Sequence, residues 1–147
     1  MKVYLVKSND IANLHAAYAA KTWAFKPRAK GAADRGLYSF LRKNVTAGTM
    51  LVGINTDADN YGALMYGFVR IDGSSGAVVP DIEVRGKTWQ GTYAFPLKVD
   101  WNYITPNGEV AVSKDVLRDI IGDLRSGHML KQITADQFRQ ILAHRSV

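Results

Sequence analysis

Cysteine is absent from this chain of 147 residues, which excludes disulfides and thiolate metal sites. We therefore expect a reducing compartment, with the cytoplasm as the default location. No apolar run reaches roughly 18 residues, so the sequence predicts no membrane-spanning helix. The opening residues, MKVYLVKSND, lack the apolar core and the cleavage site of a signal peptide.

Sequence signatures of catalysis are also missing. The chain contains no HExxH, P-loop or GxSxG motif, and its three histidines do not have the spacing of metal ligands. Three aspartates in turn-like segments form no nuclease-type carboxylate cluster: Asp57, Asp59 and Asp72. We therefore predict a protein that is not an enzyme, with no catalytic residue, no metal site and no cofactor.

The composition is that of an ordinary globular protein, with 47% hydrophobic and 22% charged residues. A chain of this length has room for one domain with a real core, so we expect residues 1–147 to form a single domain.

Positive charge is concentrated in one segment. Between Lys21 and Lys43 there are seven basic residues and one acid, Asp34, which accounts for the whole net charge of +6. The remaining twelve basic and twelve acidic residues cancel. Such a cluster favours a polyanion as partner, and the alternative is a solvated surface that aids solubility.

The N-terminal half of the chain predicts a strand, two helices and a strand pair. Residues 2–7 alternate as in a strand, and Ser8 or Asn9 can cap a helix that runs through Lys21. Ile11, Leu14 and Tyr18 have helical spacing and are expected to face the core. A loop at 24–33, a helix at 34–43 and strands at 49–55 and 61–72 follow.

The C-terminal half predicts a long connection, one strand and two helices. Residues 73–92 read as an irregular polar segment, and Leu97–Trp101 as a half-buried strand with Trp101 in the core. Ser113 can cap a helix at 114–125, and Thr134 with Gln137 forms a capping box for a last helix. This order predicts an α+β fold with a curled, mainly antiparallel sheet or barrel flanked by helices.

Aromatic and amide side chains near predicted loops indicate a site for a flat ligand. Trp23, Trp89, Tyr93 and Phe95 lie in or beside loops, and base–aromatic stacking is worth roughly 1–3 kcal/mol per base. Asn9 and Asn13 precede them and can hydrogen-bond the edge of a ring. For Trp23 the alternative is that it packs the helix against the sheet.

These residues resemble the start of the YTH domain, the N6-methyladenine reader of the PUA-like superfamily. The sequence matches the family pattern at Lys7, Ser8, Asn9 and Asn13 and then at Trp23 with no gap. The segment FPLKVDW, which ends at Trp101, is similar to a strand of the family. The resemblance covers residues 2–101, weakens over 102–125 and partly returns at 127–142.

The resemblance implies roles for the residues that match. Trp23, Trp89 and Tyr93 are expected to form an aromatic cage, with Phe95 as a substitute for Tyr93. Asn13 and Asn9 are expected to hydrogen-bond the two edges of the ring, and the backbone carbonyl of Ala24 to accept the N6–H.

Phosphate contacts are expected from basic residues. The arginine that binds phosphate in the family is not evident here, and His128 and Lys131 lie near its position. The remaining expected phosphate-binding residues are Lys7, Lys26, Arg28, Lys30, Arg42 and Lys43.

The expected partner is a nucleic acid that carries a modified base, most directly N6-methyladenine in single-stranded RNA or a base flipped out of DNA. The compact sequence also resembles prokaryotic YTH- and EVE-type modules of restriction or defence proteins, which implies a partner nuclease or NTPase chain. Two alternatives stay open: a reader of 5-methyl- or 5-hydroxymethylcytosine in DNA, and a protein-interaction domain whose basic face is incidental.

Overall fold

A computed structural model describes ten segments of the chain: residues 2–8, 10–25, 40–41, 43–56, 61–70, 82–84, 87–89, 94–106, 112–122 and 130–144. The strands are β1 (Val3–Ser8), β2 (Thr22–Phe25), β3 (Met50–Asn55), β4 (Leu64–Val69), β5 (Ile82–Val84), β6 (Lys87–Trp89), β7 (Ala94–Ile104) and β8 (Lys131–Ile133). The helices are α1 (Ile11–Ala20), α3 (Lys114–Ile121) and α4 (Ala135–Ala143).

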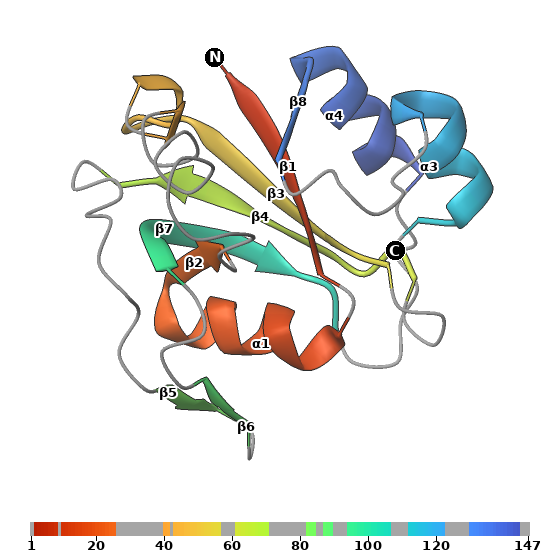
Figure 1. The fold of residues 1–147 in the computed structure, drawn as a ribbon. Helices are drawn as coiled ribbons and strands as arrows, with labels where there is room; N and C mark the ends of the chain where they lie inside the picture. Colours follow the sequence, from red (N-terminus) through yellow and green to blue (C-terminus); the bar gives the residue numbers. More distant parts are fainter. Residues whose placement is uncertain are drawn as a thin grey trace.

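Six strands form one curled sheet in the order β2-β7-β4-β3-β1-β8 (Figure 1). The pair β1 and β3 is parallel, and the other neighbouring pairs of this sheet are antiparallel. The predicted α+β class with a curled and mainly antiparallel sheet is therefore confirmed.

The two faces of the sheet build two cores. Side chains alternate along β1, so Tyr4 and Val6 join one cluster while Val3 and Leu5 join the other. The first cluster lies on the face covered by α1, and the second lies on the face covered by α3 and α4 (Figure 1). The first, which we call the α1-side core, contains Trp23.

Helix α1 differs from its prediction in its cap and in one core residue. Asp10 is the N-cap, and its carboxylate accepts the Ala12 N–H at 2.9 Å, whereas Ser8 or Asn9 was expected there. Ser8 instead belongs to β1 and exchanges hydrogen bonds with the backbone of Asp10. Tyr18 is 37% exposed, so its assignment to the core is wrong. The small side chain of Ala17 is buried in its place.

The chain reverses direction directly after α1. Lys21 adopts the left-handed conformation (φ 53°, ψ 46°), and its N–H donates to the carbonyls of Ala17 and Tyr18. Strand β2 begins at Thr22 and pairs with β7. The predicted loop therefore does not begin at residue 24, and residues 26–33 lie outside the described segments.

Trp101 lies at the rim of the α1-side core rather than inside it. Its side chain is half-buried and packs against the cluster. Its indole N–H donates to the carbonyls of Ala17 at 3.2 Å and Thr22 at 3.3 Å. Because these two carbonyls flank the reversal at Lys21, Trp101 holds β2 against the end of α1.

The remaining predicted elements are confirmed in part. Ser113 caps α3 and the capping box of Thr134 and Gln137 opens α4, but α3 ends at Ile121 rather than at 125. Residues 40–41 and 43–44 are helical, and the rest of the predicted helix at 34–43 lies outside the described residues. Strand β8 was not predicted, since three residues are too few to show a period.

The long connection at 73–92 also contains structure that the sequence did not reveal. Strands β5 and β6 pair antiparallel within it, with Ile82 opposite Trp89. In Figure 1 this hairpin lies on the outer side of α1, and β5 contacts that helix.

We predict that Gly67→Ala strongly destabilises the protein. A β carbon at Gly67 would lie 2.3 Å from the Asp100 oxygen and 2.6 Å from the Trp101 α carbon, both in the backbone of β7. Strand β7 must therefore move, and we expect a loss of about 3 kcal/mol in the free energy of unfolding, measured by urea denaturation. In the control, Gly53→Ala, the nearest atom would be Leu14 Cδ2 at 3.4 Å. Equal losses in both variants would contradict this account.

We predict that Trp101→Phe lowers the free energy of unfolding by about 1–2 kcal/mol, because two backbone carbonyls lose their indole donor. Amide hydrogen exchange in β2 should become faster. Phe68→Leu is the control, because Phe68 is 36% exposed and its ring has no donor to lose. We expect this control to change stability by less than about 0.5 kcal/mol. Unchanged exchange in β2 would show that Trp101 does not hold that strand.

Candidate nucleic-acid interface

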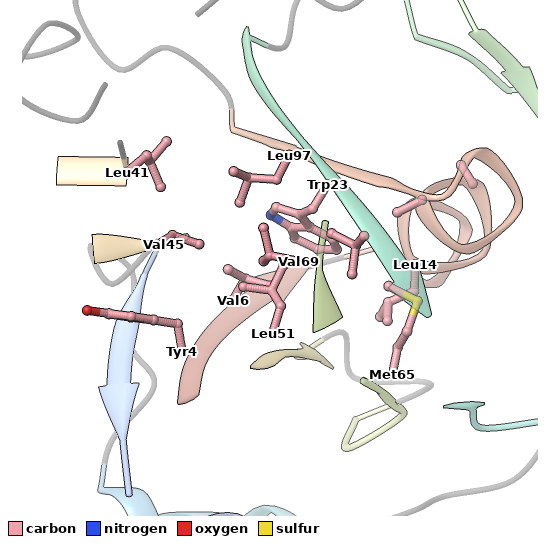
Figure 2. Packing of buried hydrophobic residues seen from close by; sticks show 13 residues of the cluster. Tyr4, Val6, Leu14, Trp23, Leu41, Val45, Leu51, Met65, Val69 and Leu97 are labelled. Atoms are coloured by element: carbon pink, nitrogen blue, oxygen red, sulfur yellow. The ribbon is translucent and has the colours of Figure 1, made fainter. Parts of the chain in front are cut away.

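Trp23 lies in the α1-side core. It pairs with Leu97 of β7, and its side chain is 7% exposed. The indole packs edge-to-face on Trp101, with ring centroids 6.4 Å apart and an interplanar angle of 74°. Figure 2 shows the ring among Leu97, Val69 and Leu14. Trp23 therefore packs α1 against the sheet, as the sequence left open, and its role as a cage wall stays a prediction.

The Trp23 ring reaches toward the first turns of α1. The space that a β carbon at Gly53 would occupy lies 3.4 Å from Leu14 Cδ2 and 3.7 Å from Trp23 Cζ3. The ring and Leu14 therefore converge over β3, although Trp23 follows the far end of the helix. Asn13 precedes Leu14 in the first turn of α1.

Ala24 lies at an edge of the sheet. The Val99 N–H donates to the Lys21 carbonyl at 3.0 Å. This bond indicates which residues of β2 turn their peptide groups toward β7. Lys21 and Trp23 therefore turn their peptide groups toward β7, and the register between the two strands shifts between Trp23 and Phe25, at Ala24. Strand β2 is the edge strand on that side, so Ala24 belongs to a strand with one neighbour among the described strands. An unpaired carbonyl of an edge strand can accept a hydrogen bond from a ligand.

The N-terminus of α1 is held by hydrogen bonds around Ser8 and Asp10. The Asp10 carbonyl accepts the Ser8 hydroxyl at 2.7 Å and the Asn13 N–H at 2.9 Å. The Ser8 carbonyl accepts the N–H of Thr56 at 2.7 Å and its hydroxyl at 3.1 Å, which ties the end of β1 to the end of β3. These bonds position Asn13, which is half-buried in the first turn. Asn9 lies outside the described residues.

The other two predicted cage residues are placed in part. Trp89 ends β6, whose partner β5 contacts α1, so the backbone of Trp89 belongs to a hairpin beside the helix that carries Asn13. Tyr93 lies outside the described residues, and Phe95 lies within β7.

Three of the predicted phosphate-binding residues are described. Lys7 is half-buried near the end of β1, and Lys43 is exposed in the helical turn before β3. Lys131 is half-buried, and its Nζ donates to the Ile121 carbonyl at 2.5 Å, at the C-terminus of α3. It lies on β8, at the opposite edge of the sheet from Trp23. The others lie outside the described residues: Lys26, Arg28, Lys30, Arg42 and His128.

Sequence reasoning missed two basic residues near β2. Lys98 pairs with Thr22 and is exposed, and the Arg70 N–H donates to the Lys98 carbonyl at 2.8 Å. The Arg70 side chain is also exposed and lies 3.8 Å from the Asp100 carboxylate. Alternation with the buried Leu97 and Val99 indicated that Lys98 is exposed, but only the strand pairing places it beside β2.

Within the described segments, no cluster of three or more His, Cys, Asp or Glu side chains could hold a metal ion. Those segments also contain no helix with the length and apolar character needed to cross a membrane.

No protein-family model matches this chain, and no curated protein sequence matches it either. Solved structures of YTH domains do match. The Mmi1 YTH domain aligns with a TM-score of 0.56 at 11% identity and covers 97% of this chain and 93% of its own. The Toxoplasma CPSF4 YTH domain, solved with an m6A-modified 7-mer RNA, has a TM-score of 0.54 at 15% identity and covers 97% and 88%.

A third match is the YTH domain of Zygosaccharomyces rouxii MRB1, solved with N6-methyladenosine RNA. Its TM-score is 0.52 at 11% identity, over 97% of this chain and 84% of its own. At such low identity the likeness concerns the path of the backbone. This chain therefore has the fold of a YTH domain.

Proposed function

We propose that this protein is a non-catalytic binding module that holds a modified base, and that the base is N6-methyladenine in single-stranded RNA. Two of the solved YTH domains with this fold were crystallised with RNA that carries this modification. In this proposal Trp23 is one wall of an aromatic cage, and Trp89 and Tyr93 supply the others.

The junction between α1 and β2 is the observation that carries the proposal. In this junction Trp23 lies on the edge strand β2, its indole meets Leu14 of α1 over Gly53, and Ala24 and Asn13 adjoin these two residues in the chain. A methylated adenine needs these three groups: a flat apolar wall for the methyl group, an acceptor for the N6–H, and an amide for the ring edge. Asn9 then binds the other ring edge.

Phosphate contacts in this proposal come from Lys7, Lys43 and the basic residues at positions 26, 28, 30 and 42. Lys131 is the exception among the described candidates, because its ammonium group already caps the carbonyl end of α3. We therefore assign Lys131 a structural role. A reader of modified cytosine in DNA and a protein-interaction domain are the alternatives that the following experiments distinguish.

Calorimetric titration with four oligonucleotides tests the proposal: RNA and DNA, each with adenine or N6-methyladenine at one site. We expect methylated RNA to bind at least about tenfold tighter than its unmethylated form, or roughly 1.4 kcal/mol. Trp23→Leu should abolish this preference, because leucine fills apolar volume but offers no aromatic wall. Phe68→Leu is the control and should keep it, since Phe68 is 36% exposed and is not part of the cluster that contains Trp23.

Equal affinity for all four oligonucleotides would contradict the methyladenine proposal. The same titration with 5-methyl- and 5-hydroxymethylcytosine in DNA would then decide whether the module reads another base. Binding of a partner protein without affinity for any oligonucleotide would show instead a protein-interaction domain.

The salt dependence of RNA binding tests the phosphate assignments. Each lysine that contacts a phosphate of a single strand contributes about 0.7 to the slope of log K against log salt concentration. We expect Lys43→Gln to reduce the slope by that amount, and Lys131→Gln to leave it unchanged while lowering the melting temperature. A reduced slope in Lys131→Gln would return that residue to the phosphate site.

A further inference from the structure

Gly53 occupies an unusual position for a glycine. It lies in the middle of β3, buried between Val6 of β1 and Met65 of β4, in one of the inner strands of the sheet. Glycine weakens a strand relative to alanine, because it loses more backbone freedom on folding and offers no side chain to pack. A glycine in such a place calls for a local reason.

Backbone conformation and close backbone packing do not supply that reason. Gly53 has no positive φ, unlike Gly48, Gly62 and Gly122. The nearest atoms to a β carbon built on it all belong to side chains, whereas the corresponding atoms at Gly67 belong to the backbone of β7. The space above Gly53 is thus defined by neighbouring side chains.

Three side chains close over this space. A β carbon at Gly53 would lie 3.4 Å from Leu14 Cδ2, 3.5 Å from Met65 Cε and 3.7 Å from Trp23 Cζ3. One β carbon therefore fits in ordinary contact. The γ carbons of a branched residue would extend one bond further, into the atoms that already surround the β carbon. Leu14 and Met65 are flexible, whereas the indole is rigid and is tied by its own strand to β7.

We propose that Gly53 is a positioning residue that sets how deeply the Trp23 indole sits in the curled sheet, and thereby sets the wall of the base cage. This inference rests on the proposed function for its effect on binding. The absence of a side chain lets the six-membered ring of Trp23 approach the backbone of β3. Because a binding wall needs placement to within about 0.5 Å, a residue larger than alanine at this position should displace the wall and weaken methyl recognition.

The test compares Gly53→Ala and Gly53→Val, each in the native background and in Trp23→Leu. The readouts are the melting temperature and the affinity for the methylated and unmethylated RNA oligonucleotides. Gly53→Ala is the control, because its β carbon makes only ordinary contacts. It should leave the methyl preference within about twofold of the native value, a difference near the precision of such a titration.

Gly53→Val should reduce the methyl preference at least fivefold in the native background. It should also lower the melting temperature by about 5 °C, as overpacking of a core does. In Trp23→Leu, where the indole no longer occupies the space, the same valine should fill it. There we expect the melting temperature to rise, with no further change in methyl preference. This reversal of sign separates an effect through Trp23 from general damage to β3.

An unchanged methyl preference in Gly53→Val, or an equal loss of stability in both backgrounds, would overturn the inference. If Gly53→Val does not fold in the native background, the double variant Gly53→Val with Trp23→Leu decides. A melting temperature above that of Trp23→Leu alone supports the inference. Failure of the double variant to fold contradicts it. The melting temperatures need no ligand. They test the contact between Gly53 and Trp23 even if the native protein shows no methyl preference, an outcome that contradicts only the proposed function.

Discussion

The left-handed turn at Lys21 is the constraint on which the rest of the structure depends. A helix that ended two residues later would carry Trp23 on another face, and β2 would not reach β7. The turn is held from both sides, since the Lys21 N–H closes the helix and the Lys21 carbonyl accepts the Val99 N–H. Trp101 adds a donor shared by the carbonyls on either side of the turn. Few bonds thus determine where the edge strand and its tryptophan lie.

The sheet separates the buried side chains into two cores, one on each face. The face covered by α3 and α4 is closed by aliphatic side chains and by Phe138, which meets Tyr66 edge-to-face at 5.3 Å. The face covered by α1 contains both the large indole of Trp23 and the glycine beneath it. Trp23 is 7% exposed, so its indole fills this core, and the bare backbone of Gly53 lets the ring pack closely.

Predictions from the sequence were confirmed where a feature depends on one interaction between residues that are close in the chain. The capping box at Thr134 and the cap at Ser113 are contacts between residues three apart, so no distant partner is needed to predict them. Tyr18 shows the limit of periodicity. Its spacing from Leu14 fits a core face, yet the buried residues of α1 are Leu14, Ala16 and Ala17. Strands β5, β6 and β8 have three residues each and become visible only through their pairing.

The sequence by itself determined the fold class and the two caps, and it contains the residues that we propose for a base site. Tertiary structure alone decided which of these residues meet. It brought Trp23 and Leu14 together over Gly53, placed Ala24 on an edge strand, and bound the Lys131 ammonium group to the end of α3. The physical reason is that a period or a motif specifies only neighbours within a few residues. Hydrogen bonds between β2 and β7, which join residues about 75 positions apart, depend on the path of the whole chain.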